Sequence, residues 1–306
     1  MAPTDLAALI RGAATDVLAG RGLGADALPA SIDLVRPRDP GHGDFSTSVA
    51  LRSAGRLGVA PARLAGWLAE ELRGAAGIAS AEVAGPGFVN VRLTAAARGA
   101  LVAEVLTAGE DYGIGPAGPV FAELVAQLDG QRVRVPGGAL GMAELVAEVG
   151  PDAARYAVLR CPPGRPPRVD PALLTRYSGD NPVFAVQYGH ARLCSIARYA
   201  AELGITPGGE FALLTHPREG ELIRTLADFP ELAHTAARRR EPHLVARHLE
   251  ALADGADRFT TLCRVLPLGD EPTDQRHRAR VSLSAAARQV LANGLRLLGV
   301  TPEERM

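Results

Sequence analysis

The glycine- and proline-rich stretch of residues 113–141 divides the sequence into two parts with different hydrophobic patterns. Before it, helical patterns alternate with short strand-like runs, two of which flank Gly85, Pro86 and Gly87. After it, nearly every apolar stripe has helical spacing. We therefore expect an α+β domain at residues 1–112, a linker at 113–141 and an all-α helical bundle at 142–306, so that the chain is mainly helical overall.

The individual elements follow from local signals. Asn181 and Pro182 predict the start of a long helix, because Asn is a good N-cap and Pro fits the first turn. The linker holds one short helix pattern and one strand-like run. Short strands are expected within residues 30–37 and 80–93. The segment RDPGHGDFS, which follows the first of them, is expected to be a turn because of its Pro and Gly content. Further helices are expected at residues 1–20, 46–57, 61–73, 94–108, 142–150, 151–160, 218–228, 242–265 and 276–298.

Composition limits the class of protein. The chain has 306 residues, 47% of them hydrophobic, which is enough for a buried core and about two domains. No run of 18 apolar residues and no basic region leading into an apolar segment is present, so we expect no membrane helix, no secretory signal and a cytoplasmic location. Cys161, Cys194 and Cys263 form no metal or disulfide pattern, and we expect neither a metal nor a cofactor.

All 33 basic residues other than histidine are arginines, and lysine is absent. This excludes a P-loop lysine, a Schiff-base lysine and a lysine on a transferring phosphate. Arginine remains able to make two parallel hydrogen bonds to a phosphate. Because the formal net charge is only −1, any RNA-binding surface has to be a local patch.

Five segments of the second part resemble the helical anticodon-binding domain of arginyl-tRNA synthetases, the DALR type. In order, they are EVGPDAARYAVLR, DNPVFAVQYGHARLCSI, CRVL, AARQVLANGLRLLGV and the closing PEERM. The first 112 residues resemble the additional N-terminal domain of that family through HGDFSTSVALRSA and GPGFVNVRL. The resemblance implies that the N-terminal domain grips the outer corner of a tRNA and the helical domain its anticodon stem.

The sequence departs from the family between these two parts. There the family has a Rossmann-type catalytic domain, whereas family-like sequence in this chain ends near Tyr112 and resumes near Gly130. The intervening piece is far shorter than the roughly 100–150 residues that a nucleotide-binding domain needs. The segment GQRVRVPGGALGMAELV resembles the family's lysine-containing loop, but Val135 stands at the lysine position. We therefore expect a pseudoenzyme, a paralogue without the class I catalytic domain and without catalytic residues.

The tetrapeptide GHAR at residues 189–192 matches the tail of the ATP-binding signature of class I aminoacyl-tRNA synthetases. That signature needs a strand-to-helix turn at a nucleotide pocket, whereas GHAR falls within the predicted long helix. We interpret it as part of the family's helical anticodon-domain segment. His190 shares an apolar stripe with Val186 and Leu193, so we expect a core histidine with hydrogen-bonded nitrogens.

Candidate RNA contacts on this helix are Phe184, Tyr188 and Arg192, which form the neighbouring stripe. Aromatic rings beside an arginine suit an unstacked RNA base, although packing in the core explains Phe184 equally well. In the first domain, Phe88 and Asn90 follow the Gly-Pro-Gly turn and point to the same face of a strand. They suit stacking on a base and bonding to its edge, and the resemblance implies contact with the tRNA D-loop. The alternative is an ordinary hairpin face.

Three further sites are weaker. Arg238, Arg239 and Arg240, with nearby histidines, form a basic run that is either a solvated face or a phosphate track. The resemblance implies that Met306, the terminal methionine, lines the anticodon pocket. It also makes Phe259 a candidate, because Phe259 and Thr260 stand where the family commonly has Phe-Tyr. Thr260 in place of the tyrosine removes one stacking platform, which weakens the case for anticodon discrimination.

Three functions are therefore considered. The first is a non-catalytic arginyl-tRNA synthetase-like protein that binds tRNA, most naturally arginine tRNA. The second is a regulatory or assembly module that binds a protein partner such as a full-length synthetase; Thr260 and the near-neutral charge favour it. The third is an arginine–tRNA ligase in arginyl-tRNA aminoacylation, which the flanking domains suggest but the missing catalytic domain opposes.

Overall fold

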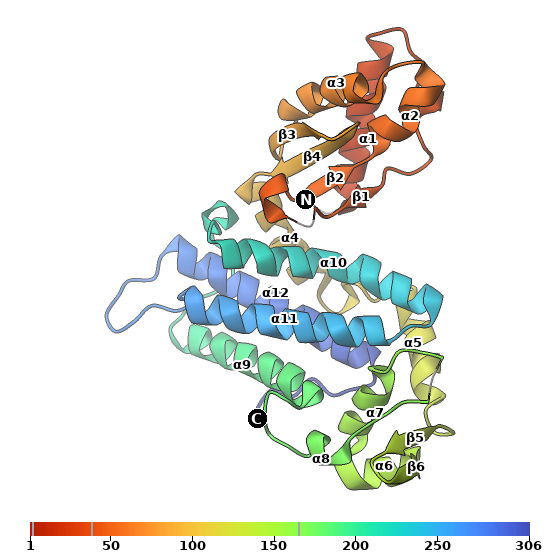
Figure 1. The fold of residues 1–306 in the computed structure, drawn as a ribbon. Coiled ribbons are helices and arrows are strands. Elements are labelled where there is room, and N and C mark those ends of the chain that lie inside the picture. The colour runs from red at the N-terminus through yellow and green to blue at the C-terminus, as the bar shows by residue number, and fades with distance from the viewer. Residues whose placement is uncertain (2, 38, 165) are drawn as a thin grey trace. The chain divides into compact units, whose positions relative to one another are not determined.

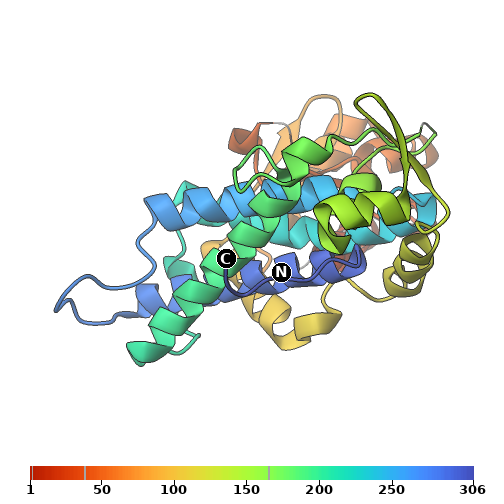
Figure 2. The same ribbon diagram turned by 90° about the horizontal axis from the view of Figure 1, so that it is seen from below.

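The computed structural model describes residues 1, 3–37, 39–164 and 166–306. The described chain packs as two compact units, Met1–Leu101 and Val102–Met306. Figures 1 and 2 show their ribbons in two views. Among the described residues, no helix is long and apolar enough to cross a membrane.

The first unit is a four-stranded antiparallel sheet with helices against one face, which confirms the predicted α+β class (Figure 1). The strand order is β1-β2-β4-β3. The helices and strands are α1 (Pro3–Ala19), α2 (Val49–Leu57), α3 (Pro61–Arg73), β1 (Leu34–Val35), β2 (Phe45–Thr47), β3 (Ile78–Ala84) and β4 (Phe88–Leu93). Since an antiparallel sheet can leave one face in water, the face away from the helices is free for function.

Strand β4 shows how the sequence sets this arrangement. Val89, Val91 and Leu93 are buried in the core, whereas Phe88 and Asn90 alternate with them and are half-buried on the other face. The sequence predicts a helix from residue 46, but α2 begins only at Val49. The reason is that β2 pairs with β4, with Phe45 opposite Val91 and Thr47 opposite Val89. Sheet pairing therefore overrides the helical pattern at its start.

The second unit is built around four long helices that run alongside one another in Figure 1. They are α9 (Pro182–Glu202), α10 (Pro217–Arg239), α11 (His243–Leu262) and α12 (Gln275–Leu297). The apolar stripe expected on α12 is buried, including Leu283, Val290 and Leu295. This confirms the predicted helical bundle.

Helix α10 is about twice as long as the sequence predicts, because it continues through Pro230. A proline inside a helix removes one hydrogen bond and usually ends or kinks it, which is why the expected helix stops at residue 228. Burial of Phe229, Ala233 and Ala236 on the core side offsets that loss.

The stretch expected to be a linker is folded and belongs to the second unit. It contains α5 (Ala117–Ala126) and a hairpin of β5 (Arg132–Val135) and β6 (Gly138–Gly141). The interpretation as a linker with few buried contacts is wrong, since Phe121, Leu128 and Val133 are buried. The glycines shape turns instead: Gly137 has a φ of 87° in the two-residue turn of the hairpin.

The junction between the units also lies earlier than the sequence suggests, within α4 (Ala95–Ala108). Tyr112 is buried in the second unit, and its hydroxyl donates to the Leu226 carbonyl at 3.2 Å. Asn293 of α12 donates to the carbonyls of Gly109 and Tyr112. The short helices α6 (Met142–Val149), α7 (Pro151–Leu159) and α8 (Pro171–Leu174) complete the second unit.

Candidate nucleic-acid interface

The start of α9 is fixed by a buried cap, as predicted. The Asn181 side-chain oxygen accepts from the Phe184 backbone N–H at 3.4 Å, and its amide donates to the Leu174 carbonyl at 2.8 Å. Pro182 occupies the first turn. These bonds fix the orientation of α9 about its own axis where it begins. They therefore fix the direction in which Phe184 and Tyr188 project, one and two turns later.

Phe184 and Tyr188 form a stacked aromatic pair. Their ring centroids are 5.7 Å apart at an interplanar angle of 15°. Tyr177 meets Phe184 edge-on at 5.9 Å and is itself 88% exposed. Tyr188 is 48% exposed, so part of its ring remains available to another flat group.

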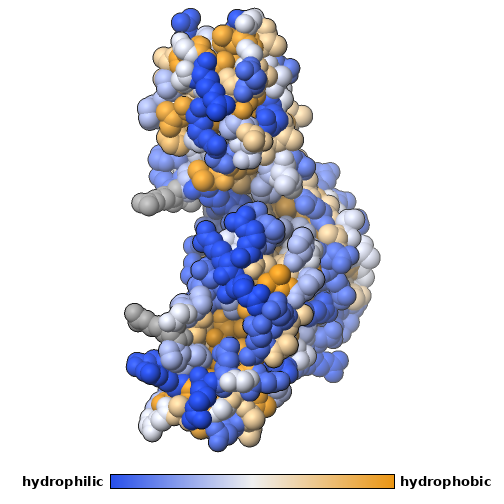
Figure 3. All heavy atoms as spheres, turned by 90° about the vertical axis from the view of Figure 1, so that its right-hand side faces the viewer, coloured by the Kyte–Doolittle hydropathy of each residue, from blue (hydrophilic) through white to orange (hydrophobic). Residues whose placement is uncertain are grey.

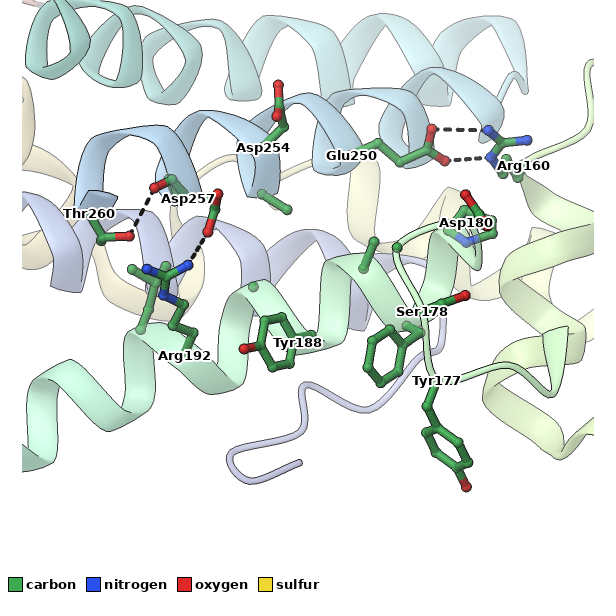
Figure 4. A pocket seen from close by; sticks show the side chains of 18 residues that line it. Arg160, Tyr177, Ser178, Asp180, Tyr188, Arg192, Glu250, Asp254, Asp257 and Thr260 are labelled. Atoms are coloured by element: carbon green, nitrogen blue, oxygen red, sulfur yellow. Dashed lines mark hydrogen bonds and ion pairs between the residues drawn. The ribbon is translucent and has the colours of Figure 1, made fainter. Parts of the chain in front are cut away.

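A groove of about 780 Å³ lies between α9 and α11 on one side of this pair (Figure 4). The two helices approach closely where Gly189 faces Ala253, because an added Cβ at Gly189 would be only 3.0 Å from the Ala253 Cβ. Figure 4 shows Tyr188 between an arginine at either end, Arg192 near Asp257 and Arg160 near Glu250. The volume is suitable for a flat organic group such as a nucleobase.

The charges of the groove are largely paired within it. Arg192 forms an ion pair with Asp257, and Arg160 donates to both carboxylate oxygens of Glu250 at 2.5 and 3.1 Å. The hydrogen bond to Glu250 raises the pKa of Arg160 further. Among the described lining residues the carboxylates outnumber the guanidinium groups; they are Asp180, Glu250, Asp254 and Asp257. Such a groove favours hydrogen-bond donors and disfavours phosphate.

A second cavity, of about 870 Å³, lies on the other side of the aromatic pair. Phe184 and Tyr188 line it as well, together with Tyr177 and the terminal Met306, which is 54% exposed. The structure thus brings three of the predicted residues, Phe184, Tyr188 and Met306, to one place. Arg192 lines only the first groove.

His190 has the role expected of a core residue. It is 4% exposed, and its Nδ1 bonds to the Glu303 carbonyl at 2.8 Å. Burial lowers its pKa, so the ring is neutral at physiological pH. The GHAR segment lies inside α9, which confirms the predicted helical placement.

Phe259 does not belong to this surface. Phe259 points into the core from α11, and its ring is fully buried. No side of the ring is open for a base to stack on, so the prediction for Phe259 is wrong. The neighbouring Thr260 hydroxyl donates to the Asp257 carbonyl at 3.1 Å and lines the groove. The helical spacing of Leu252, Ala256 and Phe259 in the sequence already places Phe259 on the apolar stripe of this helix.

The basic run lies at the end of α10 and is partly neutralised. Arg238 and Arg239 occupy the last turn, and Arg240 is a left-handed C-cap with a φ of 55°. The Arg240 guanidinium donates to both carboxylate oxygens of Glu123 at 3.1 Å, and this hydrogen bond lowers the pKa of Glu123. A histidine expected to extend the patch, His248, is buried. Arg238 and Arg239 are therefore the two arginines of the run that have no carboxylate partner among the described residues.

In the first unit, Phe88 and Asn90 share the sheet face that the helices leave uncovered. Asn90 pairs with Ser46 of β2 and with Glu82 of β3. Within the described part of the chain, no hydrogen bond of the Asn90 side chain is present, so its amide is available to a ligand. On the face drawn in Figure 3, hydrophilic and apolar side chains are mixed over both units.

Sequence reasoning missed the acidic side of the groove. Glu250, Asp254 and Asp257 are spaced four and three apart, which places them on one helix face. That spacing was visible in the sequence, but the arginines that pair with Glu250 and Asp257 lie far from them in the sequence. Across the described residues, no group of three or more His, Cys, Asp or Glu side chains is placed to hold a metal ion.

Two family models match the chain. Residues 4–93 match the arginyl tRNA synthetase N terminal domain, and residues 186–306 match the DALR anticodon binding domain. The chain belongs to the arginyl-tRNA synthetase family. The second match begins within α9 and contains Tyr188, Arg192 and α11, whereas Phe184 lies just before it, so the matched domain covers only part of the groove. Residues 94–185 match neither model.

One solved structure has the same fold over nearly the whole chain. The arginyl-tRNA synthetase of Thermus thermophilus superposes with a TM-score of 0.65 at 14% identity, over 98% of this chain and 100% of that one. A Campylobacter jejuni protein described as an arginyl-tRNA synthetase gives 0.47 at 18% identity, over 57% of this chain and 39% of that one. The Plasmodium falciparum arginyl-tRNA synthetase gives 0.44 at 17%, over 68% and 33%. This chain thus spans well under half of the latter two.

Proposed function

We propose that this protein binds arginine tRNA in the cytoplasm without aminoacylating it. The observation that carries the proposal is the stacked pair of Phe184 and Tyr188, partly exposed between two cavities where the matched anticodon-binding domain begins. RNA-binding proteins recognise single-stranded loops by stacking splayed-out bases on aromatic rings. The anticodon loop is the single-stranded part of a tRNA that would meet this surface.

The groove favours base edges over the phosphate backbone. The Asp257 and Asp254 carboxylates can accept hydrogen bonds from the amino groups of bases, whereas they repel a phosphate. Arg192 was expected to bind a phosphate, but doing so would require it to leave or share Asp257. We therefore assign affinity in this groove mainly to stacking.

The first unit would add a second contact. Phe88 and the free amide of Asn90 lie on one open sheet face, where they can stack on a base and bond to its edge. Following the family, this face would meet the outer corner of the tRNA. Phosphate contacts would come from Arg238 and Arg239, which lie in the last turn of α10.

Absence of catalysis is the second half of the proposal. The chain contains no lysine to stabilise ATP phosphates, and residues 94–185, between the two matched domains, fold into short helices and a hairpin that continue into the bundle. We expect no arginine- and tRNA-dependent pyrophosphate exchange above background. Exchange activity that co-purifies with the chain and disappears on a point substitution within it would contradict this.

A protein partner is the alternative function. The excess of carboxylates in the groove favours it, because a basic segment of another protein, such as a full-length synthetase, would be attracted to the same surface. Separate binding measurements with arginine tRNA and with a full-length synthetase distinguish the two functions. If arginine tRNA does not bind but a full-length synthetase does, the partner function replaces the RNA function.

The direct experiment is a titration of fluorescently labelled arginine tRNA with the full chain at low and at physiological salt. We expect saturable binding that survives the salt increase in part, because stacking is less sensitive to salt than phosphate contacts are. A tRNA of another specificity serves as the control. No detectable binding at low salt would remove the RNA function.

A further inference from the structure

The last residues of the chain, 301–306, are held along α9 by side-chain hydrogen bonds. The Thr301 backbone N–H donates to the Asp152 carboxylate at 2.9 Å, and the Gln187 amide donates to the Thr301 carbonyl at 3.0 Å. His190 then bonds to the Glu303 carbonyl at 2.8 Å. Arg198 of α9 also donates to the Glu304 carbonyl at 3.2 Å. These contacts come from α7 and α9, so the tail is a docked part of the second unit.

One helix therefore determines both walls of the second cavity. Phe184 and Tyr188 of α9 form the aromatic wall, while Gln187 and His190 of the same helix hold the tail that carries Met306. Because all four side chains project from one rigid helix, the position of the tail relative to the aromatic pair is fixed by the helix geometry. Met306 follows only three residues after the bond at Glu303.

His190 can act only as a donor in this contact. A backbone carbonyl accepts but cannot donate, so the neutral imidazole must carry its proton on Nδ1. Burial lowers the pKa of His190 and keeps the ring neutral, and a neutral ring with its proton on Nδ1 can still donate this bond. His190 itself lines neither of the two cavities beside the aromatic pair.

We propose that His190 is a positioning residue for RNA binding, which through its hydrogen bond to Glu303 sets Met306 against the aromatic pair of Phe184 and Tyr188. The inference rests on the proposed function, since it assigns His190 a role in base binding. Because His190 lines neither cavity, it does not contact a base bound there directly.

The first test follows the tail without RNA. The chain contains three methionines, so methyl-¹³C labelling gives three signals, and Met306→Ala identifies the one from Met306. We expect the Met306 methyl to be shifted by the neighbouring rings in the wild type. His190→Leu should move it to the position of free methionine, whereas His190→Asn should keep it shifted, because the Asn amide replaces the Nδ1–H donor. An unchanged shift in His190→Leu would overturn the proposal.

The second test measures binding of labelled arginine tRNA. We expect His190→Leu and Met306→Ala each to weaken binding by about three- to tenfold, the effect of losing one hydrogen bond or one contact. The double variant should bind no more weakly than the weaker single variant, since both act through one tail. Full binding by His190→Leu, or additive losses, would overturn the proposal.

Two controls separate the causes of failure. Gln187→Leu removes another α9 donor to the tail without removing the buried ring and without adding a methionine signal, so it should move the Met306 signal even if His190→Leu folds poorly. Failure of the wild type to bind tRNA would contradict the proposed function, whereas the methyl shifts would still decide whether His190 holds Met306.

Discussion

The groove of the second unit and the open sheet face of the first unit differ in whether their polar side chains already have partners within the protein. In the groove, Arg192 and Arg160 are each bonded to a carboxylate. On the sheet face, the Asn90 amide has no hydrogen bond among the described residues. A ligand in the groove therefore gains mainly from the exposed Tyr188 ring, while a ligand on the sheet gains from the free amide as well. Exposure of a charged residue alone is thus a poor guide to whether it binds RNA.

The largest expected effect comes from removing the cap of α9. Asn181→Ala deletes a buried side chain that makes bonds to Leu174, Arg176 and Phe184, so the second unit should lose about 2–3 kcal/mol of unfolding free energy. Urea unfolding followed by methyl signals of each unit would measure it. The sheet unit should be unaffected; equal loss in both units would show that the groove and the sheet are not separate in stability.

A smaller effect is expected from releasing Arg192. Asp257→Asn removes its ion-pair partner, so arginine tRNA should bind several-fold more tightly at low salt and with a steeper salt dependence. Asp180→Asn is the matched control, because Asp180 lines the same groove, has no ion pair among the described residues and leaves the Arg192 pair intact. If the two variants behave alike, the general charge of the groove matters and the pairing of Arg192 does not.

The smallest effect concerns pH. Burial lowers the pKa of His248 and of His190 below the usual value, so the unfolded chain binds more protons than the folded one below about pH 6.5. The unfolding free energy of the second unit should therefore have its full value at pH 7.5 and decrease as the pH drops toward 5. His248→Gln should reduce this dependence. A stability that rises on acidification over this range would contradict the assignment.

The sequence predicted the α+β and helical parts because their periodicity is local. It failed where the structure depends on residues far apart in the sequence. Strand β2 depends on pairing with β4, and α10 continues through Pro230 because its core side is buried. The glycine-rich stretch is folded because Phe121 is buried in the core of the second unit. The same holds for the candidate site. Tyr188 could be selected from its helix stripe, but the pairing of Arg192 with Asp257 and of Arg240 with Glu123 joins residues far apart in sequence.

The central claim, that an anticodon loop stacks on the aromatic pair, is tested most directly by comparing two tyrosines of one helix. Tyr188 lines both cavities, whereas Tyr199 is similarly exposed on α9 but lines neither. In titrations with labelled arginine tRNA, Tyr188→Ala should cost about 1–3 kcal/mol of binding free energy, the usual value for one stacked base. Tyr199→Ala should bind as the wild type does. Equal affinities for both variants and the wild type would contradict the claim.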